Sequence, residues 1–477
     1  MVKKLIVPAG AYPCQWRYRD QVVSGELRLE ESKAPAGELY DVPGTWVESE
    51  HSKSFQSHKD TADVLRGWTR RGDNAVLLQV QLGYLLPERS WVQAKVALIG
   101  HDLPDDMRFD SVEFQVGGLT EVSGIRPVKK VAVPDTFEND PETSATWDSE
   151  ATWQKWITAE GDQLELTFNP EIAWNQGFSF SLTAAPVLEV SGRPRAAEDW
   201  MSQYVRPLAE ITSLATQRPQ PVSWVLLRRG GKDKPPVQLF ASDVVQQPYD
   251  AAPPEHPELI SYGSGSLIRL GPGGAALPDL LKGWASLRTR YSTFFDYLTV
   301  ALPASISTRS RFLALVPALE GLHVAKYGDG PMRRAEYKRQ RRDVIRRLSE
   351  AEGVDQGDVG FIKDWLAVYG SYKLEERLHQ IRDRELGTKL RDRIQERVDP
   401  LPAVLEGLVQ GATDVWAVMG TARNRIAHGD ANQPSAAQLA TLTRLAHTVA
   451  IGAALNHLGI PDTILCDAID QDRWPLI

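Results

Sequence analysis

An arginine and a histidine lie five residues apart near the end of the chain, in the segment Arg423-Asn424-Arg425-Ile426-Ala427-His428. A guanidinium group stays charged and can hold a phosphate through two hydrogen bonds, whereas an imidazole titrates near neutral pH and can move protons. Together they suffice for phosphoester cleavage without a metal ion. Because the spacing also arises by chance in a chain this rich in basic residues, its surroundings must decide its meaning.

The helix expected to carry this pair has one apolar stripe. Its residues at i, i+4, i+7 and i+11 are Val415, Met419, Ala422 and Ile426. At about 100° per residue, Arg423 falls at the edge of this stripe, while Asn424 and His428 lie on the open side. Gly429 directly follows His428, as is typical of a helix C-cap. The polar side chains are therefore not needed for packing.

Five residues on an ideal helix turn the Arg423 and His428 side chains roughly 140° apart. One helix therefore presents the pair poorly. Two such helices facing each other across a two-fold axis could place two arginines and two histidines around one phosphate, so we predict a homodimer with a composite site. The alternative is a surface arginine and a helix-ending histidine without chemistry.

A second basic feature precedes this helix. Its cationic residues are Arg333, Arg334, Lys338, Arg339, Arg341, Arg342, Arg346 and Arg347, against Glu336 and Asp343. The net charge of −8 argues against a protein that coats nucleic acid through its overall field, so any contact with RNA must be local. We predict RNA binding through Arg339, Arg341 and Arg342; the alternative is a solvated helix face.

Composition bounds the class of protein. A chain of 477 residues predicts two or three domains, and 42% hydrophobic with 24% charged residues is typical of soluble globular proteins. Neither a membrane span nor a secretory segment is evident, which predicts a cytoplasmic protein without a membrane partner.

The cysteines and N-terminal histidines show no sign of a disulfide or metal site. We expect Cys14 and Cys466 to be reduced structural thiols. Three N-terminal histidines lack metal-ligand spacing, so we expect neither metal nor cofactor; they are His51, His58 and His101.

Hydrophobic periodicity divides the chain into an α+β multidomain arrangement. Residues 1–195 repeat with period two, which predicts a β-rich antiparallel sandwich or partly closed barrel. Two of its expected strand faces are Val76, Leu78, Val80 and Leu82, and Val92, Ala94, Val96 and Leu98. Residues 196–300 predict an α/β bridging region, with a helix over 196–216 and a strand over 221–228. Residues 301–477 predict an all-α bundle.

The period of helices begins after Pro278. The expected helices are 278–300, 308–326, 333–350, 357–370, 372–396, 400–428 and 435–458. Ser435 and Gln438 fit a capping box at the start of the last one.

The segment Thr421–Asp430 resembles the Arg-Asn-x-x-x-His motif of HEPN ribonucleases, especially of the ApeA-like group. Residues 311–323 are similar to the helix that opens that family's HEPN domain, and residues 371–378 resemble, more loosely, its central helix with an Arg-Leu pair. The order of strands and the helix with Trp200 are similar to its β-rich domain. The chain departs from relatives in having no aromatic residue within Arg425-Ile426-Ala427.

The resemblance implies a ribonuclease of anti-phage abortive infection that cleaves tRNA or other cellular RNA after a phage-derived trigger is sensed. Arg423 and His428 become the catalytic pair and Asn424 their polar neighbour. The ribose 2′-OH would attack its own phosphate to leave 2′,3′-cyclic phosphate and 5′-OH ends. Glu320 could orient Arg423 or be a solvated flank residue, and His323 is expected to be structural. The alternative function is a non-catalytic HEPN module that binds RNA or a partner protein.

Overall fold

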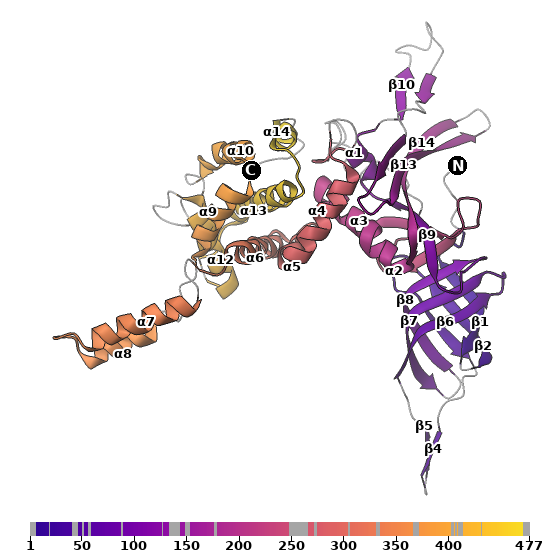
Figure 1. The fold of residues 1–477 in the computed structure, drawn as a ribbon, viewed down its shortest axis with the longest axis horizontal. Helices are drawn as coiled ribbons and strands as arrows, with labels where there is room; N and C mark the ends of the chain where they lie inside the picture. Colours follow the sequence, from indigo (N-terminus) through magenta and orange to yellow (C-terminus); the bar gives the residue numbers. More distant parts are fainter. Residues whose placement is uncertain are drawn as a thin grey trace. The chain divides into compact units, whose positions relative to one another are not determined.

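The computed structural model forms two compact units, residues 1–282 and 283–477 (Figure 1). It describes residues 6–18, 20–40, 46–49, 52–55, 59–86, 89–125, 127–132, 144–147, 153–175, 179–247, 266–270, 274–303, 306–330, 334–365, 372–401, 405, 408, 414–430 and 432–470. The boundary between the units falls within the stretch 196–300 that the sequence predicts as a bridging region. The first unit is β-rich and the second is all-helical, which confirms the predicted fold class.

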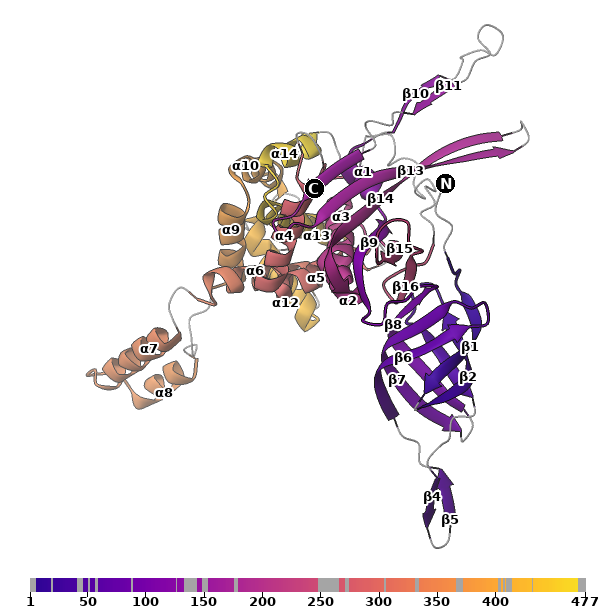
Figure 2. The same cartoon turned by 45° about the vertical axis from the view of Figure 1, so that its right-hand side comes forward.

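A closed barrel of six antiparallel strands begins the first unit (Figure 2). Its strands are β1 (Gly10–Tyr18), β2 (Gln21–Leu29), β3 (Ala36–Tyr40), β6 (Lys59–Thr69), β7 (Asn74–Leu86) and β8 (Arg89–Gly100). They pair in the order β8-β3-β2-β1-β6-β7, and the pairing of β7 with β8 closes the ring. Of the two predicted alternatives, the barrel is therefore correct, and it is closed rather than partly open.

The barrel core follows the predicted alternation in β1, where Cys14 and Trp16 point inward, but not in β7. Gln79 has a φ of 53°, and this left-handed residue shifts the alternation by one position. The inward residues of β7 are therefore Ala75, Leu77, Val80 and Leu82, and those of β8 are Val92, Ala94, Ala97 and Ile99. The single face predicted for each of these two strands is therefore wrong in part. The residues that do not share the inward face are Val76 and Leu78 on β7, and Val96 and Leu98 on β8.

Trp16 fills the barrel because its neighbour strands carry glycine beside it. Gly67 lies directly opposite Trp16 on β6, where a Cβ would come within 2.6 Å of the indole ring.

Both cysteines of the chain are free, as predicted: Cys14 is buried in this core and Cys466 is half-buried in the second unit.

Strand β8 also leads out of the barrel. On one edge, β3 pairs with residues 89–93 and β16 with residues 96–99. The sheet thus continues into six further antiparallel strands in the order β16-β15-β9-β14-β13-β12. These are β9 (Arg108–Val116), β12 (Trp153–Ile157), β13 (Gln163–Asn175), β14 (Ser179–Ala196), β15 (Val222–Arg228) and β16 (Val237–Ala241). Two separate hairpins are β4 (Trp46–Ser49) with β5 (Ser52–Phe55), and β10 (Val128–Ala132) with β11 (Ser144–Trp147).

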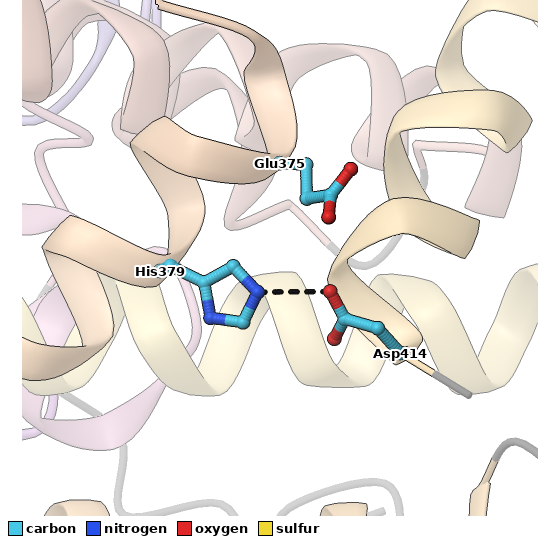
Figure 3. A group of neighbouring side chains, drawn as sticks. All are labelled: Glu375, His379 and Asp414. Carbon is cyan, nitrogen blue, oxygen red and sulfur yellow. Dashed lines mark hydrogen bonds and ion pairs between the residues drawn. The ribbon is translucent and has the colours of Figure 1, made fainter. Parts of the chain in front are cut away.

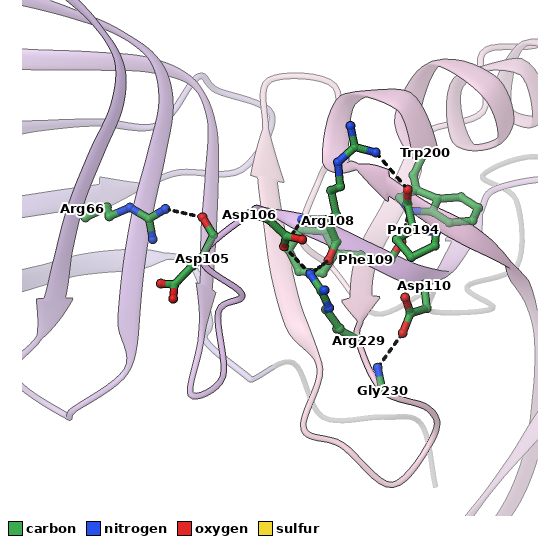
Figure 4. A network of polar contacts seen from close by, with 10 residues as sticks. All are labelled: Arg66, Asp105, Asp106, Arg108, Phe109, Asp110, Pro194, Trp200, Arg229 and Gly230. Atoms are coloured by element: carbon green, nitrogen blue, oxygen red, sulfur yellow. Dashed lines mark hydrogen bonds and ion pairs between the residues drawn. The ribbon is translucent and has the colours of Figure 1, made fainter.

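The connection between β8 and β9 is held from both sides (Figure 4). Arg66 of the barrel donates to the carbonyl oxygen of Asp105 at 2.8 Å. On the other side, Arg229 pairs with the Asp106 carboxylate and donates to the carbonyl oxygen of Arg108. Both contacts therefore flank the loop that joins the barrel to the second sheet.

One helical segment, residues 197–216, packs on the second sheet after β14. It comprises α2 (Ala197–Trp200), a single π-helical turn η1 (Met201–Val205) and α3 (Arg206–Thr216); α1 (Leu119–Ser123) lies near it. Trp200 is fully buried and its indole N–H donates to the carbonyl oxygen of Phe109 on β9 at 3.0 Å. The predicted helix over 196–216, with Trp200, and the predicted strand over 221–228 are confirmed.

The second unit is built from helices, most of which match the predicted ranges. They are α4 (Leu277–Arg290, which spans the boundary), α5 (Ser292–Ala301), α6 (Thr308–Tyr327), α7 (Arg334–Ser349), α8 (Gln356–Trp365), α9 (Leu374–Glu385), α10 (Thr388–Val398), α12 (Val415–His428), α13 (Ala436–His457) and α14 (Asp462–Asp470). The capping box at Ser435 and Gln438 is present. Helix α14 was not predicted. In the described part of the chain, each helix is too short or too polar to cross a bilayer.

Two predicted helices are broken in the structure. The range 278–300 is interrupted at Tyr291, whose backbone is non-helical (φ −132°, ψ 44°). The range 372–396 is interrupted at Leu386 and Gly387, which are extended. The range 400–428 is wrong at its start, since Asp414 is extended and caps α12, and several residues before it lie outside the described residues. The end of the range 357–370 also lies outside them.

Helix α6 forms the centre of the bundle. It packs against α5, α9, α12 and α13, and apolar residues cover most of its circumference. Its buried side chains include Phe312, Leu315, Val316, Leu319 and Leu322. The helix that carries Arg423 and His428 is therefore positioned by a buried scaffold.

Candidate functional site

Both ends of helix α12 are capped. The Asp414 carboxylate accepts a hydrogen bond from the backbone N–H of Trp416 at 3.2 Å. Gly429 adopts the left-handed conformation (φ 69°), and its N–H donates to the carbonyl oxygens of Arg425 and Ile426. The predicted C-cap at Gly429 is confirmed, so His428 is the last helical residue.

The predicted faces of α12 are confirmed. The four stripe residues are buried: Val415, Met419, Ala422 and Ile426. Arg423 is half-buried at the edge of the stripe, whereas Asn424 and His428 are exposed. The imidazole makes no hydrogen bond or ion pair with any residue that the structure describes. His428 is thus available to a ligand from solvent.

Arg423 is held by two neighbours. One guanidinium nitrogen lies 3.5 Å from the Glu320 carboxylate of α6, and the other donates to the side-chain oxygen of Asn424 at 3.1 Å. The side chains of Arg423 and Glu320 remain 33% and 25% exposed. The structure therefore brings Arg423, Asn424 and Glu320 together, and the guanidinium keeps a face open to solvent.

Two further arginines fix the end of this helix. Arg309, near the start of α6, donates to the carbonyl oxygen of Ile426 at 3.2 Å. Arg425 donates to the carbonyl oxygens of Leu408 and Asn432 at 2.7 and 3.2 Å. Sequence reasoning missed Arg309, because nothing in its local pattern indicates a partner 117 residues away. Arg425 holds the loops around α12, whereas Arg423 faces outward.

The second predicted site lies on α7, which packs beside α8 (Figure 1). Arg339 and Arg342 are exposed, while Arg341 is half-buried and donates to the carbonyl oxygen of Lys363 on α8. Phe361 on α8 is 63% exposed. Arg333 lies outside the described residues. A cationic helix beside an exposed aromatic ring offers groups that bind phosphates and stack on bases.

His323 has the structural role expected of it. It is fully buried, and its Nε2 lies 3.1 Å from the side-chain oxygen of Gln380. Burial lowers its pKa, as do the nearby cations Arg377 and Arg384. The Arg-Leu pair that resembles the family's central helix is also structural: Arg377 pairs with Asp329 at 2.6 Å, and Leu378 is buried.

The structure brings together one group that sequence reasoning missed (Figure 3). Glu375 and His379 of α9 face Asp414 at the start of α12, and one ligand atom from each lies within 4.8 Å of the other two. The i, i+4 spacing of Glu375 and His379 was a local signal for this group. Its third member could not be anticipated, because Asp414 is brought in by tertiary packing.

A family model described as ApeA N-terminal domain 1 matches residues 16–264, more than half of the chain. The chain belongs to the ApeA family. This match lies within the β-rich first unit, so it bears on the N-terminal part of the predicted resemblance. Helix α12 lies outside the matched ApeA residues. No curated protein and no solved structure matches the chain.

Proposed function

We propose that this ApeA-family protein is a metal-independent endoribonuclease of anti-phage abortive infection, with Arg423 and His428 as its catalytic pair. Membership of the ApeA family supports the defence role. The observation that carries the catalytic assignment is the outward placement of Arg423, Asn424 and His428 at the end of a well-capped helix. None of these three side chains is needed to fill the core.

The proposed reaction is an internal attack within RNA. His428 takes the proton of the ribose 2′-OH as its oxygen attacks the adjacent phosphorus, and the bond to the 5′ oxygen of the next nucleotide breaks. The leaving oxygen takes up a proton from water. The products are a 2′,3′-cyclic phosphate and a 5′-OH, and DNA is inert because it lacks the 2′-OH.

Arg423 stabilises the charge that develops on the phosphate oxygens in the transition state. Such a role needs a guanidinium held in one orientation before the substrate binds. Glu320 and Asn424 supply this restraint, at 3.5 and 3.1 Å, while the side chain keeps a third of its surface exposed. Glu320 is thus proposed as a positioning residue and Asn424 as a polar neighbour of the reacting phosphate.

A homodimer would complete the site. Arg423 and His428 lie five residues apart on one regular helix, so their side chains leave α12 in directions roughly 140° apart. Two copies of α12 related by a two-fold axis bring the arginine of one subunit near the histidine of the other. Arg339, Arg341 and Arg342 on α7 would guide RNA, with tRNA as the proposed substrate, by contacting its phosphates.

Cleavage of tRNA in EDTA by the purified wild type and by His428→Ala tests this proposal. We expect the wild type to produce 5′-OH and cyclic phosphate ends with the chelator present, and the variant to produce none. Cleavage that survives the substitution would contradict the mechanism, as would loss of cleavage in EDTA while the Tm of the protein stays unchanged. Binding of RNA by both proteins with cleavage by neither would instead favour a non-catalytic RNA-binding module.

A further inference from the structure

Three side chains with metal-ligating atoms converge between α9 and α12 (Figure 3). His379 Nε2 lies 2.8 Å from one Asp414 oxygen, and the Glu375 carboxylate faces the same place. All three residues are half-buried. We propose that Glu375, His379 and Asp414 form a binding site for one divalent transition-metal ion, with Zn²⁺ as the best-fitting candidate.

The arrangement of the donors favours one ion. Glu375 and His379 are one helical turn apart, so their side chains leave the same face of α9. Asp414 offers two oxygens, one of which accepts the N–H of Trp416 at the start of α12. Its other oxygen faces His379. Cap and ligand roles therefore use different atoms of one carboxylate.

The chemistry of the donors selects the class of ion. One imidazole nitrogen with two carboxylate oxygens suits Zn²⁺ and similar first-row ions, whereas sites for Mg²⁺ or Ca²⁺ consist of oxygens. Zinc sites bind four ligands, and solvent can supply the fourth because His379 and Asp414 keep 34% and 31% of their side chains exposed.

The surroundings hold the imidazole in place. The His379 and Trp416 rings lie 6.2 Å apart, centroid to centroid. The Arg382 guanidinium lies over the Trp416 ring, 5.8 Å from its centroid. Fixed ligands lower the entropic cost of binding an ion. The competing arrangement is an ion pair of protonated His379 with Asp414 alone, which leaves Glu375 without a role in the group.

The expected consequence is structural. An ion at this place would join α9 to the first turn of α12, the helix whose last turn carries His428. Fourteen residues separate Asp414 from His428, which is about 21 Å along the helix axis. The ion is therefore remote from the proposed reaction and would stabilise the helix without entering the chemistry. The proposal stands independently of RNA cleavage.

Titration of Zn²⁺ into untagged, EDTA-stripped and desalted full-length protein tests the site by calorimetry. We expect the wild type to bind one Zn²⁺ per chain. The affinity for Zn²⁺ should be weaker by about 10-fold or more in His379→Ala and in the conservative Glu375→Gln. The matched control is His101→Ala, since His101 also lies beside an aspartate, Asp73 at 3.4 Å, but has no third ligand in the described residues.

Thermal unfolding supplies a second measurement that does not depend on the variants folding equally well. Zn²⁺ should raise the Tm of the wild type and of His101→Ala over the EDTA-treated protein, because an ion that binds the folded state stabilises it. The same addition should raise the Tm of Glu375→Gln by less than it raises that of the wild type. Failure of the wild type to bind Zn²⁺, or binding by His379→Ala and Glu375→Gln equal to that of the wild type, would overturn the proposal.

Discussion

Arg423 on α12 lies 3.5 Å from Glu320 on α6, although 103 residues separate them in the chain. This contact turns a surface arginine into an oriented one. A partly exposed ion pair contributes about 0 to 1 kcal/mol to stability. We therefore expect this pair to act mainly by orienting the guanidinium and not by stabilising the bundle.

Substitution of this pair should separate activity from stability. We expect Arg423→Ala to lower the RNA cleavage rate by about 100-fold or more, as loss of a group that stabilises transition-state charge does. Glu320→Gln should lower it by a smaller factor, and Tm should change little in either variant. Glu350→Gln, another exposed carboxylate of the second unit, is the control. A large fall in Tm for Glu320→Gln would show that Glu320 serves stability instead.

Mixed dimers test whether the site is shared between subunits. Arg423→Ala and His428→Ala chains should each be inactive alone. In a heterodimer isolated with two different tags, the shared site retains an arginine from one chain and a histidine from the other, so a measurable part of the wild-type activity should return. Heterodimers as inactive as the two parents would show that Arg423 and His428 act within one chain.

Removal of charge from α7 should weaken RNA binding without affecting the reaction of bound RNA. Arg339 and Arg342 are the better targets, because Arg341 also bonds α8. In the double alanine variant, we expect the slope of log K against log salt concentration to fall by about 1 to 2, as for the loss of two phosphate contacts. Filter binding at several salt concentrations measures this slope. Arg444→Ala, an exposed arginine on α13, should leave the slope unchanged.

The lowered pKa of Glu385 predicts that the stability of the folded chain depends on pH. Burial raises its pKa, but contacts with His457, Lys326 and Tyr327 outweigh burial and lower the pKa from 4.5 to about 2. A carboxylate whose pKa is lowered by folding stabilises the folded chain above the unfolded pKa, and this contribution disappears as the pH falls through the folded pKa.

At pH 7, Glu385→Gln should therefore destabilise the protein by about 3 to 5 kcal/mol, as the loss of one partner of a buried ion pair does. The difference in Tm between variant and wild type should shrink from pH 4.5 toward pH 2. Calorimetric scans across this range measure the difference. A difference that stays constant with pH would show that the Glu385 carboxylate is not the source of the stabilisation.

Local patterns predicted the parts of the fold that depend on neighbours in sequence. The stripe on α12 follows from its apolar spacing, and Gly429 ends the helix because glycine adopts the left-handed backbone at little cost. The same reasoning failed at Gln79, where a left-handed residue that is not glycine shifts the inward and outward alternation of the side chains while the pairing register stays the same. It also failed at Tyr291, a buried residue whose non-helical backbone interrupts a stretch of helix-forming residues.

The candidate site was predictable to a similar extent. The exposure of Asn424 and His428 follows from helical geometry alone. The contacts of Arg423 with Glu320, and of His379 with Asp414, join residues 103 and 35 positions apart, and such distances are set by how helices pack. The residue type predicts that an arginine or an aspartate forms an ion pair or a hydrogen bond, but it does not predict the partner residue.

Sequencing of RNA 5′-OH ends from cells that express the wild type or His428→Ala, with and without phage infection, tests the central proposal most directly. We predict that infection produces new 5′-OH ends, in tRNA foremost, in cells with the wild type, and that these ends are absent with His428→Ala at equal protein level. The same ends in both strains, or infection-dependent growth arrest by the wild type without new 5′-OH ends, would contradict the assignment of Arg423 and His428 as the pair that cuts RNA.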